Sequence, residues 1–211
     1  MSGYTLYWKP GSGSMVVEAA LRMIGVAFDA VEVDDTADTA FLALNPAGKV
    51  PVLKLACGPV IAESAAILIS LDDMFPEARL LPPRGRSGHV KAVQWLIFMA
   101  TNIYPACLRY YYPERHTTDP AHEAAEAIRS QAALDMDRDF ARLAAVVQGP
   151  FLTGQTLTIT DVYAAMLADW YDPAKSTPEI KALVSRVLGN PAVVEAWRNH
   201  GFGVSDAPGA A

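Results

Sequence analysis

Two short motifs in the first third of the chain carry residue types that could bind a small peptide. In the first, the polar turn Asn45–Lys49 leads into Val50-Pro51 and then into a short apolar stretch. Proline has no N–H and is found at the entrance or the edge of a strand. We therefore expect the N–H and C=O of Val50 to be free to pair with an extended ligand rather than with another strand.

The second motif is Glu63-Ser64, which directly precedes an apolar helical segment. The first N–H groups of a helix lack intrahelical acceptors, and together with the helix dipole they attract a carboxylate. The Ser64 hydroxyl could donate to such a carboxylate, whereas Glu63 could accept hydrogen bonds from an ammonium group. Together the two motifs predict a site for a small peptide that has a free α-amino acid end.

The pattern around these motifs predicts a small sheet with helices on its faces, because strand-like and helix-like segments alternate. The expected strands are Thr5–Trp8, Phe28–Val33, Val52–Leu55 and Val60–Ala62. The expected helices are Ser14–Ile24, Ala37–Leu44 and Ala65–Phe75. The resulting order, βαβαββα, predicts an α/β domain over residues 1–79.

The rest of the chain lacks strand signals and predicts an all-α domain. Residues 80–88 are rich in proline and glycine and are expected to form a linker, with a helical bundle over residues 89–211. The expected helices are Val90–Leu108, Pro120–Val147, Ile159–Tyr171, Pro178–Leu188 and Pro191–His200. Thr158 and Asp161 have the spacing of a capping box, and Leu157 and Val162 are placed to form a hydrophobic staple. This element is expected to be structural.

The first motifs resemble the thioredoxin-like, glutathione-binding half of the cytosolic glutathione S-transferases. The family pattern N-P-x-G-x-V-P-x-L, followed by an acidic residue and Ser before a helix, is present here as N-P-A-G-K-V-P-V-L and E-S. The resemblance implies that the proline is cis, that the residue before it pairs with the cysteinyl backbone of glutathione, and that the acid–serine pair holds the γ-glutamyl end. The residues that it assigns to glutathione binding are Trp8, Lys49, Val50, Pro51, Glu63 and Ser64.

The turn after the first strand, residues 7–15, is where the resemblance places the chemistry on the glutathione thiol. It is similar to the bacterial beta-class turn Y-Y-K-P-G-A-C-S, but Gly13 stands in place of the cysteine of that class. The serine-using, delta-like pattern implies Ser12 as the hydroxyl that donates to the thiolate, with Ser14 as the alternative. Either serine could instead cap the first helix. Tyr7 is expected to point to the sheet face opposite to Trp8.

The aromatic segment 102–113 is expected to line a pocket for an electrophile. Tyr104, Arg109 and Tyr111 are the candidates to orient that second substrate. The aromatic side chains could instead pack the junction between the domains. Beta-class enzymes have a His-Lys pair near Tyr104-Pro105, and this chain departs from that pattern, so the substrates of that class are not implied.

The composition indicates a globular protein and argues against several classes of partner. The 211 residues are 52% hydrophobic and 19% charged, with a net charge of −6. No basic cluster suggests nucleic-acid binding, and no apolar run is long enough to span a membrane. No histidine has zinc-ligand spacing, so no metal is expected. Cys57 and Cys107 are expected to be small buried side chains of a reduced, cytoplasmic protein.

The resemblance implies an enzyme that conjugates the glutathione thiolate to small hydrophobic electrophiles, a detoxification reaction. One alternative is a glutathione-dependent disulfide reductase or ether lyase. Another is a non-catalytic protein that binds ligands or regulates a partner. A homodimer is expected, with the N-terminal domain of one subunit against the helical domain of the other, because interface-sized apolar patches are rare on monomers.

Overall fold

The computed structural model describes residues 3–147 and 149–203, which group into two compact units. Residues up to Pro83 form one unit together with those from Ser185 onward, and Arg84–Val184 form the other. The structure therefore places the end of the described chain with its beginning. The sequence-based division into 1–79, 80–88 and 89–211 stays a prediction, since compactness does not show which segments fold independently.

The first unit is built on a four-stranded sheet in the order β2-β1-β3-β4. The strands are β1 (Tyr4–Trp8), β2 (Phe28–Glu32), β3 (Val52–Lys54) and β4 (Val60–Ala62). The helices that connect or follow them are α1 (Ser14–Ile24), α2 (Thr39–Leu44) and α3 (Ser64–Met74). β1 pairs parallel to β2 through the α1 crossover and antiparallel to β3. The predicted thioredoxin-like βαβαββα arrangement is confirmed.

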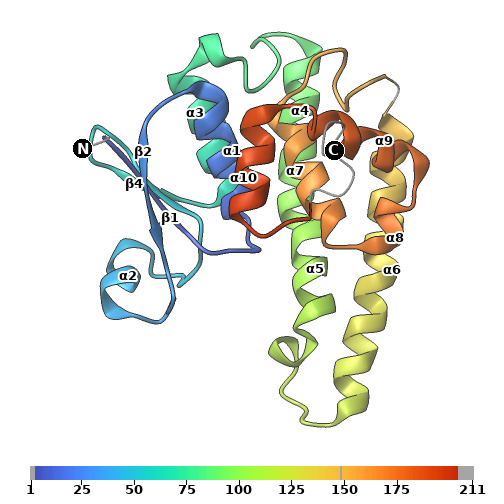
Figure 1. Cartoon of the computed structure of the whole chain (residues 1–211). Coiled ribbons are helices and arrows are strands. Elements are labelled where there is room, and N and C mark those ends of the chain that lie inside the picture. Colours follow the sequence, from blue (N-terminus) through green and yellow to red (C-terminus); the bar gives the residue numbers. More distant parts are fainter. Residues whose placement is uncertain (1–2, 148, 204–211) are drawn as a thin grey trace. The chain divides into compact units, whose positions relative to one another are not determined.

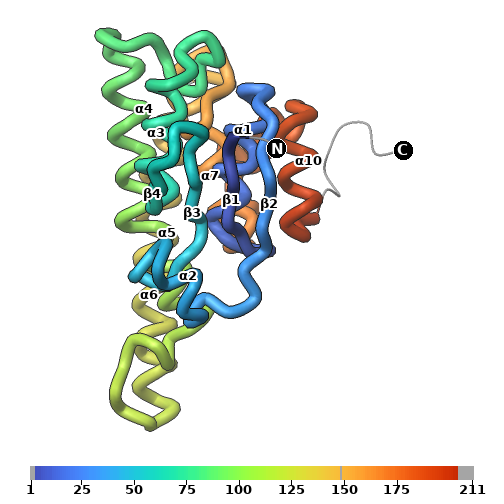
Figure 2. The backbone as a smooth tube through the Cα atoms, turned by 90° about the vertical axis from the view of Figure 1, so that its left-hand side faces the viewer, coloured from blue at the N-terminus to red at the C-terminus, as the bar shows by residue number. Residues whose placement is uncertain are grey.

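The alternation of side chains along β1 divides the two faces of this sheet. Leu6 is fully buried, and the Trp8 ring contacts His200, which caps the last helix, α10 (Pro191–Asn199). Tyr7 points to the other face and packs against Phe41 of α2, as expected for adjacent residues of a strand. Figures 1 and 2 show α1, α3 and α10 on one side of the sheet and α2 on the other.

The second unit is helical, in agreement with the predicted all-α half. Its helices are α4 (Ser87–Phe98), α5 (Tyr104–Tyr111), α6 (His122–Val146), α7 (Ile159–Asp169), the short α8 (Asp172–Lys175), and most of α9 (Pro178–Val187). Short 3₁₀ turns occupy Pro76–Ala78 in the first unit and Pro113–His116 in the second. α5 and α6 lie side by side (Figure 1). α4 starts at Ser87, within the segment that was expected to be a linker.

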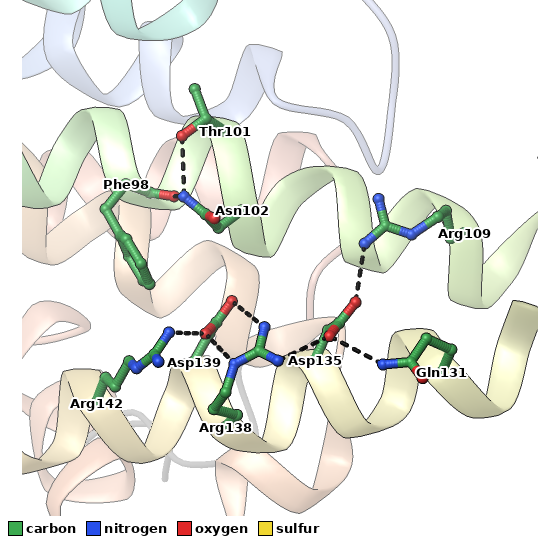
Figure 3. Close-up of polar contacts among 9 residues, drawn as sticks. All are labelled: Phe98, Thr101, Asn102, Arg109, Gln131, Asp135, Arg138, Asp139 and Arg142. Carbon is green, nitrogen blue, oxygen red and sulfur yellow. Dashed lines mark hydrogen bonds and ion pairs between the residues drawn. The ribbon is translucent and has the colours of Figure 1, made fainter.

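The segment Val90–Leu108 is helical throughout, as predicted, but its hydrogen-bonding pattern is not uniform. A π-helical segment, Met99–Ile103, separates α4 from α5. Pro105 explains the π segment, because it cannot donate to the carbonyl four residues earlier and its ring crowds the preceding turn. Side chains of the π segment bond to the end of α4. The Thr101 hydroxyl donates to the Ile97 carbonyl at 2.9 Å. The Asn102 amide donates to the Phe98 carbonyl at 3.1 Å (Figure 3).

A row of ion pairs along α6 lies close to these residues (Figure 3). Arg138 bridges Asp135 and Asp139, at 3.0 and 3.1 Å. Arg142 is 2.8 Å from Asp139, and Arg109 of α5 is 3.3 Å from Asp135. Arg138 and Arg142 each follow an aspartate by three residues and lie on the same helix face as that aspartate, which explains two of the pairs within α6.

The start of α7 contains the expected capping box. The Asp161 carboxylate accepts hydrogen bonds from the Thr158 N–H at 2.8 Å, the Thr158 hydroxyl at 2.7 Å, and the Leu152 N–H at 2.8 Å. Asp161 is fully buried, and burial raises the pKa of its carboxyl although these hydrogen bonds act in the opposite direction. The box therefore ties the preceding loop to the helix, as predicted for a structural element.

The two cysteines differ in environment. Cys107 is buried on α5, as expected, and burial raises the pKa of its thiol to about 12. The expectation of burial is wrong for Cys57, which is exposed in the turn between β3 and β4. Turn positions face solvent even when the residue type prefers the core. Over residues 3–147 and 149–203, no helix combines the length and apolar character that crossing a bilayer requires.

Candidate functional site

The strand register brings the three predicted site segments to one edge of the sheet. Tyr7 of β1 pairs with Val52 of β3, and Val52 pairs with Ala62 of β4. This row lies at the carboxyl ends of β1 and β4 and at the start of β3. The turn after β1, the Val50-Pro51 step and the Glu63-Ser64 pair each begin one or two residues beyond it. The fold therefore collects residues from three separate parts of the sequence.

The turn after β1 is held by its own hydroxyl groups. The Ser12 hydroxyl is 2.7 Å from the Lys9 carbonyl and 2.9 Å from the Ser14 hydroxyl, and its oxygen accepts from the Ser14 N–H at 3.2 Å. A hydroxyl has one proton, so Ser12 donates to only one of these oxygens at a time. Ser14 is 0% exposed, whereas Ser12 is half-buried. The N-cap of α1 is Gly13, so neither serine occupies the cap position itself.

The Val50-Pro51 step is cis, as the family resemblance implies. The Val50 side chain packs against the buried cluster Val33, Phe41 and Val52. Within the described ranges, the Val50 backbone forms no hydrogen bond with another backbone group. Its N–H and C=O are thus positioned by packing while their hydrogen-bonding capacity stays available.

Asn45 organises the turn that leads into this step. Its side-chain amide donates to the Lys49 carbonyl at 2.7 Å, and its oxygen accepts from the Ala47 N–H at 3.2 Å. Asn45 is buried and Lys49 is exposed, so the backbone of the turn is fixed while the lysine side chain extends to solvent. Asn45, the first residue of the motif, therefore fixes the backbone of the turn that leads to Val50-Pro51.

Glu63 has an unusual backbone conformation. Its φ of 67° and ψ of 108° are rare for a residue with a side chain. The side chain is exposed and makes no hydrogen bond or ion pair with any other described residue. α3 begins directly after it, at the half-buried Ser64. Strained backbone at a helix start, with an unused carboxylate, is typical of a ligand-binding position.

A polar cluster beneath the turn was missed by the sequence analysis. Glu18 of α1 accepts hydrogen bonds from Arg22, Asn199 and His200 at 2.8, 2.7 and 3.1 Å. Burial opposes ionisation of Glu18, but these hydrogen bonds outweigh it and hold the pKa of the carboxyl below its usual value. An acidic residue inside the apolar run Met15–Leu21 was the available signal, because an acid in a buried helix face needs partners.

The three residues expected to orient an electrophile belong to the second unit. Tyr104 and Tyr111 both contact Trp170: the Tyr104 ring packs edge-on at 5.3 Å, and the Tyr111 hydroxyl donates to the Trp170 carbonyl. Arg109 points to Asp135 of α6 instead (Figure 3). The structure brings the two tyrosines together and directs the arginine elsewhere. Their role in acceptor binding stays a prediction.

Metal binding has no support within the described ranges. No three histidine, cysteine, aspartate or glutamate side chains gather there in a way that could hold a metal ion.

The comparisons with known proteins agree with this geometry. Residues 14–74 match the family described as "Glutathione S-transferase, N-terminal domain". Glutathione S-transferase GstA of Escherichia coli O157:H7 is 29% identical over 207 residues, which cover 93% of this chain and 98% of the relative.

Solved structures extend the likeness to both units. A glutathione transferase homologue from Sulfitobacter, with bound glutathione, has a TM-score of 0.85 at 22% identity and covers 96% of this chain and 100% of its own. A sphingomonad glutathione S-transferase complexed with glutathione has a TM-score of 0.79 at 26% identity, with coverages of 94% and 100%. The site geometry, the matched N-terminal region and these full-length likenesses lead to one conclusion: the chain belongs to the glutathione S-transferase family.

Proposed function

We propose that this protein is a glutathione transferase that conjugates the glutathione thiolate to small hydrophobic electrophiles. The observation that carries the proposal is the row Tyr7–Val52–Ala62, which collects a hydroxyl-bearing turn, a strand entrance and an acidic helix start at one sheet edge. Each of these segments suits a different part of one tripeptide.

Glutathione is placed by matching its groups to this edge. The exposed Glu63 carboxylate accepts from the α-ammonium of the γ-glutamyl end, and Ser64 with the start of α3 binds the α-carboxylate. The backbone of Val50 pairs with the cysteinyl residue. Lys49 and Trp8 complete the binding residues. The glutathione named in the Sulfitobacter and sphingomonad structures supports this choice of ligand.

Activation of the thiol is assigned to Ser12. A free thiol has a pKa of about 8.5, and lowering it by about two units requires roughly 2.7 kcal/mol of preferential binding of the thiolate. A hydroxyl donor and the N-terminus of α1 can supply stabilisation of this size. Ser12 is the better donor because it is half-buried, whereas Ser14 is fully buried. To donate to the thiolate, the Ser12 hydroxyl turns its one proton away from the Lys9 carbonyl, and the Ser14 hydroxyl can then donate to the Ser12 oxygen.

The alternative reactions are distinguished by the residue at position 13. A mixed disulfide between protein and glutathione requires a cysteine, and this turn has Gly13 at the N-cap of α1. Conjugation requires only the bound thiolate, since holding thiolate and acceptor together lowers the entropic barrier. The assignment of Tyr104, Arg109 and Tyr111 to the electrophile pocket belongs to the same proposal.

The deciding experiment combines an activity panel with two serine variants. The unsubstituted protein should turn over chloronitrobenzenes with glutathione, and it should reduce a disulfide substrate slowly or not at all. Ser12→Ala should raise the pKa of the bound thiol and lower turnover about ten- to a hundredfold, the effect of losing a donor to an anion. Its glutathione affinity should change little. A bound thiol that titrates like free glutathione in the unsubstituted protein would refute the proposal and favour a non-catalytic binding role.

The assembly and location of the protein are also proposed. We expect a cytoplasmic homodimer. Val90 and Leu134 of the second unit are 65% and 62% exposed, and large apolar side chains at the surface suit an interface between subunits. The two unpaired cysteines suit a reducing compartment. Light scattering that gives a monomer at micromolar concentration would remove the dimer from this proposal.

A further inference from the structure

A buried polar cluster joins α1 to the end of α10 within the first unit. Glu18 is 3% exposed and His200 is 2% exposed. One carboxylate oxygen of Glu18 accepts from Asn199 Nδ2 at 2.7 Å and from Arg22 Nε at 2.8 Å, and the other lies 3.1 Å from His200 Nε2. A carboxylate only accepts, so the proton of this last hydrogen bond is on Nε2. Every oxygen of the buried acid thus has a donor.

The same histidine contacts the turn that carries the candidate catalytic serines. The His200 carbonyl accepts a hydrogen bond from the Gly11 N–H at 3.1 Å, and the His200 ring packs against the Trp8 ring with centroids 4.7 Å apart. These contacts lie on both sides of Lys9, whose carbonyl is 2.7 Å from the Ser12 hydroxyl. The helix end therefore contacts the backbone on which Ser12 is positioned.

The end of α10 is itself firmly fixed. The N–H of Phe202 bonds to the Trp197 carbonyl at 3.1 Å and that of Gly201 to the Arg198 carbonyl at 3.0 Å, which is the Schellman pattern. Gly201 has a φ of 76°, the left-handed conformation that this pattern needs. The rings of Trp197 and Phe202 are 5.0 Å apart and supply its usual apolar contact. His200 occupies the C-cap of this closed helix end.

We propose that Glu18, Asn199 and His200 are positioning residues that hold the Lys9–Ser14 turn in its reactive geometry. The inference rests on the proposed function for its kinetic consequence. The physical basis of the inference is that a buried charged cluster stabilises a fold less than apolar packing does. The directional hydrogen bonds of this cluster therefore point to a role in positioning the residues that it contacts. A displacement of about 1 Å at a reacting group can cost about a hundredfold in rate.

The test compares three variants in the full chain. Glu18→Gln keeps the shape but removes the charge, His200→Phe keeps the ring against Trp8 but removes the hydrogen bond to Glu18, and Arg198→Gln is the control. Arg198 is exposed at the same helix end, and its side chain forms no hydrogen bond or ion pair with any described residue. Each variant is measured for glutathione affinity by calorimetry, for thiolate formation by ultraviolet titration, and for turnover of a chloronitrobenzene.

The first two variants should lower kcat about tenfold and raise the pKa of the bound thiol, with glutathione affinity changed by less than about threefold. Their effects should be non-additive in the double variant, because both act through one hydrogen bond. Arg198→Gln should match the unsubstituted protein. Lower melting temperatures with unchanged kcat and an unchanged thiolate titration would overturn the proposal, since the cluster would then only support the fold.

Amide hydrogen exchange keeps the test decisive if a variant does not fold. In the unsubstituted protein, the Gly11 N–H should exchange as slowly as the amides at the end of α10, because it opens only when that helix end moves. Fast exchange at Gly11 would overturn the inference without any kinetic data. Absence of transferase activity in the unsubstituted protein would instead refute the proposed function, and the exchange result would still decide whether α10 holds the turn.

Discussion

Substitutions of Glu63 can separate the contribution of its side chain to ligand binding from the effect of its backbone conformation on stability. Its side chain is proposed to bind the ammonium group of glutathione, while its backbone is held at a φ of 67°. Glu63→Ala removes the carboxylate and keeps a Cβ in the unfavourable conformation. Glu63→Gly removes the carboxylate and the Cβ together. The two variants should therefore bind glutathione equally weakly but differ in stability.

The expected sizes follow from the local structure. A hydrogen bond to a charged group contributes about 1.5–3 kcal/mol, and the exposure of Glu63 puts the loss at the lower end, about tenfold in Kd. A residue with a Cβ in the left-handed region lowers the free energy of unfolding by about 1–2 kcal/mol, and Glu63→Gly regains this amount. The greater conformational freedom of glycine in the unfolded chain offsets about 0.4–1 kcal/mol of that gain. Glu63→Gly should thus melt about 2–3 °C above Glu63→Ala.

Calorimetric titration with glutathione and thermal melts of the free proteins provide both measurements. A glutathione analogue that lacks the α-amino group should bind the unsubstituted protein and both variants alike. Glu77→Ala is a matched control, because Glu77 follows α3 in the 3₁₀ segment Pro76–Ala78 and does not have positive φ. Unchanged glutathione affinity in Glu63→Ala would refute the assignment of the ammonium site. A glycine variant less stable than the alanine variant would refute the argument from strain.

Two further predictions concern stability. Asp161→Ala leaves the buried N–H groups of Leu152 and Thr158 without acceptors. Calorimetry should therefore show that the free energy of unfolding falls by about 3 kcal/mol, or that Tm falls by about 6–12 °C. The control Asp119→Ala loses one exposed hydrogen bond and should lower the free energy of unfolding by less than about 1 kcal/mol. The second prediction concerns Glu18, whose hydrogen-bond partners hold the pKa of its carboxyl below the unfolded value of about 4.3. The contribution of the ionised carboxylate to the free energy of unfolding is therefore complete above that pH, and it is lost as the pH falls through the lower pKa of the folded state. The difference in Tm between the unsubstituted protein and Glu18→Gln should therefore be constant above about pH 5 and should shrink in acid; a difference that grew on acidification would contradict this sign.

Features set by local sequence were predictable from the chain alone. The α1 boundaries follow from helical spacing and from Gly25, which ends the helix in a left-handed conformation. The capping box at Thr158 and Asp161 depends on two residues three apart, and the structure contains it. The antiparallel pairing of β3 with β4 follows from the short turn between them, and the α1 crossover permits the parallel pairing of β1 with β2.

Features set by contacts between distant residues were not predictable in the same way. Glu18 and His200 are far apart in the sequence, and no local pattern indicates that they meet. Apolar periodicity correctly predicted helix on both sides of Pro105, but it does not indicate the π segment between α4 and α5. Arg109 was assigned to a pocket by its position in an aromatic segment, although the aspartate that it contacts comes from another helix.

The return of the chain to its first unit has a consequence for synthesis. α10 packs against α1, whose residues Met15–Leu21 are buried, yet α10 leaves the ribosome only after the whole second unit. Domains usually fold in the order in which they are made, but here the first unit lacks α10 until the second unit has been synthesised. Until then the apolar side of α1 is uncovered, which gives the nascent chain an exposed surface that chaperones recognise. Residues 1–83 expressed alone would keep that surface permanently.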